Sequence, residues 1–363
     1  MYFERTKTSE LTQKIGQNAI LMGFVDSKRD HGKVTFIDLK DSSGIVQCVG
    51  VGKMGELAGQ DVIKISGLVK KRPENMINPN SPLGEIEIEV LEYEVLNKSK
   101  ELPIPVDTDG HEINKESRLI FSYLDLRRER MQKIMKLRSN FARALREELF
   151  KYEFVEIETP LLTKSTKEGA RDFIVPSRFN PGKFYALPQS PQQYKQLLMA
   201  TGIEKYFQFA KCIRDEDLRA DRGFEFTQLD LEISYVERDE VIKIVQDIVI
   251  NSVKNVSGKI KDENFPVISY KDAIEKFGSD KFDLRTPEEK EQGVLAFAWV
   301  VDFPFFKRVD KNDVAEVLDG KSGYTFTHNP FSMPNPENLE DHMNGKNVEQ
   351  IKTTQYDLVC NGY

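Results

Sequence analysis

The chain has 363 residues, of which 39% are hydrophobic and 31% charged, and its formal net charge at pH 7 is -7. These values are typical of a folded globular protein and exclude a disordered or fibrous chain, and the length predicts two domains. The negative charge repels a phosphate backbone, so nucleic acid would need local basic patches. The three cysteines and four histidines are scattered, which excludes a CxxC zinc site.

The longest apolar run, 294–306, is too short to span a bilayer and contains Asp302 and Pro304. The N-terminus has no apolar segment that could act as a secretion signal. We therefore expect a cytoplasmic protein without a membrane partner.

Residues 19–97 read as short alternating segments separated by turn signals. The segments expected as strands are 20–25, 33–39, 45–49, 61–67 and 84–90. Five strands of this size predict an oligonucleotide-binding (OB) barrel, which reads single-stranded bases by aromatic stacking in a basic groove. Phe36 with Lys28, Arg29, Lys33 and Lys40 would suit such a groove, although the pattern also fits a core phenylalanine beside a solvated lysine face.

The Pro-containing stretch 101–107 interrupts the strands and predicts a linker. Apolar residues then recur every three or four positions from Met131 to Leu149, which predicts an amphipathic helix. Strand-like segments at 154–157, 184–187, 224–233, 296–303 and 356–360 alternate with helical ones. The sequence therefore predicts an α+β protein with a barrel over 1–98, a linker or hinge over 99–130 and a second domain over 131–363.

A dense charged loop, 214–222, leads into a strand on which Phe226, Gln228, Asp230 and Glu232 share one face. Three neighbouring polar side chains would be costly in a core without partners, so this face favours a polar pocket. A solvated strand face beside a salt-bridged loop is the alternative.

Residues 214–222, Arg-Asp-Glu-Asp-Leu-Arg-Ala-Asp-Arg, followed by Glu-Phe-Thr-Gln-Leu-Asp at 225–230, resemble motif 2 of class II aminoacyl-tRNA synthetases in its aspartyl form. Residues 156–160 resemble motif 1, and 166–173 and 187–196 resemble the family's aspartate-binding segments. The resemblance covers nearly the whole chain. It implies an OB-fold anticodon-binding domain followed by a class II antiparallel-sheet catalytic domain of the bacterial type.

This resemblance implies an enzyme that activates L-aspartate with ATP and Mg²⁺ and transfers it to tRNA(Asp). Arg214 would stabilise the charge that gathers on the α-phosphate, and Lys195 would bind the substrate's side-chain carboxylate and disfavour asparagine. The residues implied around aspartate are Glu168, Ser190, Gln192, Lys195, Arg214, Asp230 and His328. Those implied around ATP are Arg214, Asp215, Glu216 and Gly223, with Asp357 as the Mg²⁺ ligand.

The same resemblance implies that Arg29, His31, Phe36, Gln47 and Glu87 meet the anticodon. His31 resembles the relaxed bacterial form, which charges both tRNA(Asp) and tRNA(Asn). Pro160 of motif 1 implies an interface between two copies in a homodimer.

The chain also departs from the family pattern. The interval between 285 and 299 is too short for the domain that bacterial relatives usually insert there, and the sequence stops before the expected motif 3. We therefore expect a C-terminally truncated fragment that is inactive alone. Two alternatives stay open: an asparaginyl-tRNA synthetase, which Lys195 argues against, and a non-catalytic tRNA-binding paralogue.

Overall fold

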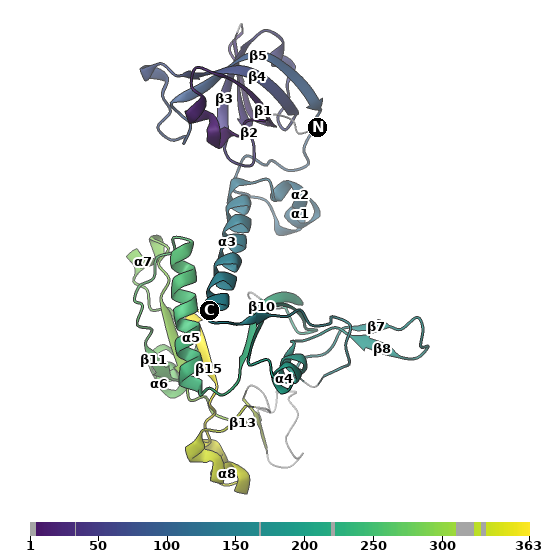
Figure 1. The fold of residues 1–363 in the computed structure, drawn as a ribbon, viewed down its shortest axis with the longest axis vertical. Helices are drawn as coiled ribbons and strands as arrows, with labels where there is room; N and C mark the ends of the chain where they lie inside the picture. The colour runs from purple at the N-terminus through teal and green to yellow at the C-terminus, as the bar shows by residue number, and fades with distance from the viewer. Residues whose placement is uncertain (1–4, 33, 167, 219–221, 310–322, 328–331) are drawn as a thin grey trace. The chain divides into compact units, whose positions relative to one another are not determined.

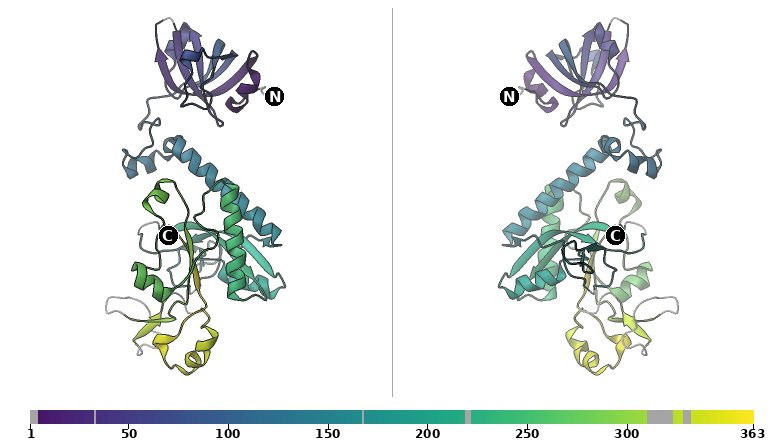
Figure 2. Two further views of the ribbon diagram at one scale, coloured as in Figure 1. Left: turned by 90° about the vertical axis from the view of Figure 1, so that its left-hand side faces the viewer. Right: turned by 90° about the vertical axis from the view of Figure 1, so that its right-hand side faces the viewer.

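The computed structural model describes residues 5–32, 34–166, 168–218, 222–309, 323–327 and 332–363. Contacts divide the chain into two compact units, Met1–Ile134 and Met135–Tyr363, which Figures 1 and 2 show from three sides. Among the described residues, no helix has the length and apolar character needed to cross a membrane.

The first unit is built around a closed five-stranded barrel in the order β1-β2-β3-β5-β4. The strands are β1 (Asn18–Asp30), β2 (Val34–Lys40), β3 (Ile45–Val51), β4 (Val62–Lys71) and β5 (Ile86–Asn97), with the 3-10 turns η1 (Thr8–Lys14), η2 (Lys53–Glu56) and η3 (Glu74–Met76). Only β3 and β5 run parallel. Alternate residues such as Leu21, Ile37 and Ile63 fill the barrel. The predicted OB-type barrel is confirmed.

Asp41, in the turn between β2 and β3, ties this turn to η1. Its carboxylate accepts hydrogen bonds from the backbone N–H of Thr8 at 3.0 Å, from the Thr8 hydroxyl at 2.6 Å and from the backbone N–H groups of Ser43 and Gly44. Burial would raise the pKa of Asp41, but these hydrogen bonds outweigh it and lower the pKa to about 2.

The segment after the barrel is folded around a buried arginine. It contains α1 (Lys115–Ile120) and α2 (Ser122–Asp125) and leads into α3 (Glu129–Lys151). Arg128 is fully buried and donates to Asp125 at 2.7 Å and to the carbonyl oxygens of Pro105 at 2.7 Å and Thr108 at 2.9 Å. Gly110 has φ +82°, and a Cβ there would lie 2.6 Å from Arg128 Nε, so a glycine is required.

Two small sheets form the second unit. The first has the order β10-β9-β6, from β6 (Val155–Glu156), β9 (Lys205–Ile213) and β10 (Glu225–Ile233), and its β9–β10 pair is antiparallel. The second has the order β11-β12-β15, from β11 (Val267–Ser269), β12 (Phe297–Val301) and β15 (Tyr356–Cys360), and its β12–β15 pair is antiparallel. Strand β9 was not among the expected strands, because both Tyr206 and Phe207 are fully buried and the segment lacks alternation.

The other elements of this unit are helices and hairpins. They are β7 (Ile174–Pro176), β8 (Phe184–Ala186), α4 (Gln192–Ala200), α5 (Arg238–Asn255), α6 (Tyr270–Phe277), α7 (Pro287–Glu291), β13 (Phe306–Arg308), β14 (Tyr324–Phe326), η4 (Pro336–Asn338), α8 (Leu339–Asn344) and η5 (Val348–Gln350). Helix α5 packs on both sheets, since Ile248 joins the core around Phe207 and Val249 joins the core around Trp299. The Trp299 indole donates to Gln246 of α5 at 3.0 Å.

Candidate active site

The β9–β10 pair presents one apolar and one polar face. Leu229 and Leu231 pack in the core beneath α3 and α5. The opposite face carries Asp230 and Glu232, which pair in register with Gln208 and Tyr206 of β9. The Tyr206 hydroxyl is buried and donates to Gln208 Oε1 at 2.8 Å. The Asp230 side chain is 11% exposed, so this polar row is not a solvated strand face.

Lys195 of α4 lies over this face. Its Nζ is 2.9 Å from Asp230 Oδ1 and 3.2 Å from Glu232 Oε2, and its side chain is 13% exposed. Burial alone would lower the pKa of Lys195, but the two carboxylates outweigh it and raise the pKa. Lys195 therefore stays protonated at neutral pH. Glu232 was not in the set that the resemblance implied, although its place in the polar row was a signal.

Two carboxylate oxygens, Asp230 Oδ2 and Glu168 Oε1, are buried without a hydrogen-bond partner in the described part of the chain. The other oxygen of Glu168 accepts from the Ser190 hydroxyl at 2.6 Å, and the backbone N–H of Gln192 donates to the same hydroxyl at 3.3 Å. Burial raises the pKa of the Cys212 thiol to about 11, and the charges of Asp230 and Glu168 add to this effect, so both carboxylates lie near Cys212. The pocket holds more negative than positive charge.

Arg214 directly follows β9. Its Nε donates to the carbonyl oxygen of Gln189 at 3.2 Å, and its guanidinium lies 5.1 Å from the centre of the Phe226 ring. No other side-chain hydrogen bond of Arg214 is found among the residues that the structure describes, so its Nη donors can reach a ligand. Asp215 bonds through its backbone N–H to Arg171 O and pairs with the Arg171 guanidinium at 3.5 Å.

Glu216 and Gly223 lie on the loop between β9 and β10, of which 219–221 are not described. His328 also lies outside the described residues.

Asp357 lies on β15. Its carboxylate accepts a hydrogen bond from Gln355 Nε2 at 3.4 Å. The other end of that amide, Gln355 Oε1, is buried without a partner in the described ranges. Burial and the charge of Glu232 raise the pKa of the intervening Tyr356, so β15 runs beside the Lys195 pocket. The Asp357 carboxylate is the kind of oxygen ligand that Mg²⁺ takes together with phosphates and water. No cluster of three or more metal-ligating side chains was found within the described part of the chain.

Hydrogen bonds on the barrel surface join three of the residues implied for the anticodon, and a ring contact joins the other two. Arg29 Nη2 donates to Gln47 Oε1 at 3.1 Å, and Gln47 Nε2 donates to Glu87 Oε2 at 3.0 Å. The Phe36 ring is half-buried, and its centre lies 5.7 Å from that of His31 at a nearly perpendicular angle. The core alternative for Phe36 is wrong, because its neighbours in β2 point inward instead.

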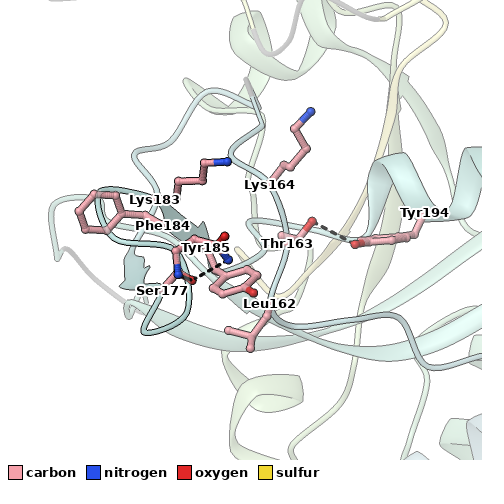
Figure 3. A pocket seen from close by; sticks show the side chains of 9 residues that line it. Leu162, Thr163, Lys164, Ser177, Lys183, Phe184, Tyr185 and Tyr194 are labelled. Atoms are coloured by element: carbon pink, nitrogen blue, oxygen red, sulfur yellow. Dashed lines mark hydrogen bonds between the residues drawn. The ribbon is translucent and has the colours of Figure 1, made fainter.

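A cavity of about 360 Å³ lies between residues 162–164 and the β7–β8 hairpin (Figure 3). Lys164, Lys183 and Tyr185 line it, and a hydrogen bond of 3.1 Å between Thr163 Oγ1 and the Tyr194 hydroxyl closes one side. None of the described residues implied for aspartate lines this cavity.

Residues 114–363 match the family model of class II tRNA synthetases (D, K and N). The chain belongs to this family. Residues 19–96 of the synthetase match the OB-fold nucleic acid binding domain. A protein of Moorella thermoacetica named aspartate–tRNA(Asp/Asn) ligase is 47% identical over 277 residues, which cover 74% of this chain and 46% of the relative. Its namesake in Methylacidiphilum infernorum is 46% identical over 316 residues, covering 85% and 52%. The synthetase chain spans about half the length of these curated relatives.

Solved structures of the family share the fold of the synthetase. The asparaginyl-tRNA synthetase of Pyrococcus horikoshii complexed with asparaginyl-adenylate is 25% identical, with a TM-score of 0.69 over 86% of this chain and 78% of that one. The aspartyl-tRNA synthetase of Entamoeba histolytica is 18% identical, with a TM-score of 0.71 over 99% and 76%, a likeness of fold alone.

Proposed function

We propose that these residues belong to an aspartate–tRNA ligase, which converts L-aspartate and ATP to aspartyl-adenylate and then transfers aspartate to the 3′ end of tRNA(Asp) and tRNA(Asn). The observation that carries the proposal is a largely buried lysine paired with Asp230, whose second carboxylate oxygen, like one oxygen of Glu168, is buried without a partner among the described residues. The names of the curated relatives support it.

L-aspartate carries one ammonium group and two carboxylates, and the pocket offers a partner to each end. Glu168 Oε1 and Asp230 Oδ2 would accept from the ammonium, beside Ser190 and Gln192. Lys195 would meet the side-chain carboxylate. Asparagine would place a neutral amide there and lose the charge-assisted contact with Lys195 that a carboxylate makes, so the pocket favours aspartate.

Adenylate formation joins the α-carboxylate of aspartate to the α-phosphorus of ATP and releases pyrophosphate. The attacking carboxylate is already ionised, so positioning and charge stabilisation can carry the step without a general base. The Arg214 Nη groups make no hydrogen bond among the described residues and would meet the negative charge that develops on the α-phosphate. Asp215, Glu216 and Gly223 are proposed to border the nucleotide. Asp357 would be a ligand of Mg²⁺, which neutralises phosphate charge when bound.

For the tRNA, the barrel surface with Arg29, Phe36, Gln47 and Glu87 would bind anticodon bases by stacking and hydrogen bonding. His31, packed against Phe36, is our proposed determinant of relaxed selection between the two tRNAs. This reaction serves translation, so we propose a cytoplasmic location.

We further propose a homodimer with Pro160 at its interface. Pro160 is exposed, and the apolar side chains that follow it, Leu161 and Leu162, are 48% and 54% exposed. An exposed apolar segment of this kind fits a subunit interface.

The test is ATP–pyrophosphate exchange by the protein that the complete gene encodes. Exchange should require L-aspartate, and Arg214→Ala should remove on the order of 3 kcal/mol of transition-state stabilisation. Arg146→Ala is the matched control, since Arg146 also stacks on a phenylalanine, Phe209, but on the apolar face of the sheet. Its exchange rate should stay near that of the unmodified protein.

Exchange driven equally well by asparagine would overturn the aspartate assignment. A complete gene product that binds tRNA without any exchange would favour a non-catalytic paralogue.

A further inference from the structure

The side-chain amide of Gln189 lies inside the loop that carries Glu168. Gln189 is 1% exposed. Its Oε1 accepts from the backbone N–H of Ala170 at 3.0 Å, and its Nε2 donates to the carbonyl oxygens of Ala170 at 2.8 Å and Thr166 at 3.4 Å and to the Asp172 carboxylate. One amide therefore binds the loop on both sides of Glu168.

Among the described residues, the loop has few other attachments. The Ser165 hydroxyl donates to the Asp172 carboxylate at 2.5 Å, and the carbonyl oxygen of Arg171 accepts from the backbone N–H of Asp215 at 3.0 Å. Gly169, next to Glu168, has φ +107°, a conformation that favours glycine, and a glycine backbone is less restricted than that of other residues. Among the described residues, only the Ser190 hydroxyl donates to the Glu168 carboxylate. The Gln189 amide is thus the main attachment of the described backbone on either side of Glu168.

The backbone of Gln189 serves a second group of the pocket. Its carbonyl oxygen accepts from Arg214 Nε at 3.2 Å, and the next residue in the chain is Ser190. Gln189 is therefore attached to the loop of Glu168 through its side chain and to Arg214 through its main chain. A substitution of the side chain should disturb the first attachment and spare the second.

We propose that Gln189 is a positioning residue that fixes Glu168 for the ammonium group of the amino-acid substrate. The proposal rests on the proposed function, because it concerns the same pocket. Buried amide and peptide groups are destabilised when they lose their hydrogen-bond partners, so the loop would rearrange once the amide is removed. A variant without this amide should bind the amino acid more weakly, with a higher KM for aspartate and little change in KM for ATP.

A hydrogen-exchange experiment on the 363-residue chain tests whether the Gln189 amide holds the loop of Glu168. In Gln189→Ala, peptides that contain Ala170 should exchange about tenfold faster, because the Ala170 N–H loses its acceptor, while peptides from β9 and β10 keep their rates. Gln246→Ala is the control, since Gln246 also uses both amide ends, toward Trp299 and Glu263, away from this loop. It should leave the Ala170 peptides unchanged. Unchanged exchange in Gln189→Ala would overturn the proposal.

Exchange that rises throughout the second unit in Gln189→Ala would mean a general loss of fold. Gln189→Met then replaces it, because methionine keeps the volume and removes only the hydrogen bonds. If Gln189→Met also loosens the whole unit, Gln189 supports the fold at large and the proposal is wrong.

Kinetics of the complete gene product test whether Gln189 affects binding of the amino acid. In ATP–pyrophosphate exchange, Gln189→Ala should raise KM for aspartate about tenfold and change KM for ATP less than about twofold. Glu168→Ala combined with Gln189→Ala should be no worse than Glu168→Ala alone, because the two act as one unit.

Additive effects, or equal changes in both KM values, would overturn the positioning role of Gln189. If Glu168→Ala leaves KM for aspartate unchanged, the ammonium site of the proposed function fails instead, and with it this inference. If Glu168→Ala raises KM and Gln189→Ala does not, only the inference fails.

Discussion

Carboxylates of two kinds are buried in this chain, and their hydrogen bonds separate them. Both carboxylate oxygens of Asp41 accept hydrogen bonds, from Thr8, Ser43 and Gly44, so neither needs a ligand. Asp230 and Glu168 each keep one buried oxygen without a partner among the described residues. A buried, unpaired carboxylate oxygen is unfavourable, so it indicates a place where a cation binds. The first kind contributes to stability and the second to the proposed function.

Asp41→Asn should destabilise the barrel by about 2 kcal/mol at pH 7. The folded-state pKa of Asp41, about 2, is below its ordinary value, so its stabilisation is present above pH 4 and is lost as the pH falls through 2. Urea unfolding followed by far-UV circular dichroism at pH 7 and pH 2 measures the difference. A gap of equal size at both pH values would contradict this origin.

At the level of elements, the outer face of β2 and its neighbours carries the proposed anticodon surface. Phe36→Ala should weaken tRNA charging by about 1–3 kcal/mol through the loss of one base stack, because stacking on an aromatic ring has this strength. ATP–pyrophosphate exchange, which needs no tRNA, should stay nearly intact. Both activities are measured on the complete gene product. Equal loss of both would contradict the assignment of Phe36.

Sequence predicted the barrel well because its signals are local. Each expected strand overlaps an observed one, since alternation and turn residues act over a few positions. Strand β9 escaped this reasoning because Tyr206 and Phe207 are both buried. The strand face that carries Asp230 was predictable from alternation. Two other features join segments that are distant in the sequence and so leave no local pattern: the contact of Glu232 with Lys195 and the enclosure of the Gln189 amide.

On the scale of the whole molecule, the two units have separate hydrophobic cores. One core fills the barrel, and three others lie in the second unit, two of them against α5. The segment after the barrel is folded around Arg128, and its contacts make it part of the first unit. Separate cores predict that the units can unfold in separate transitions.

The place of Trp299 gives this two-unit organisation an optical consequence. It is the only tryptophan of the chain and is buried against α5, with Tyr356 beside it. Its fluorescence therefore reports on the second unit alone, whereas circular dichroism reports on both. Asp41→Asn should shift a circular dichroism transition and leave the midpoint of the fluorescence transition in place. Unfolding of the barrel alone would change neither the wavelength nor the intensity of the tryptophan emission.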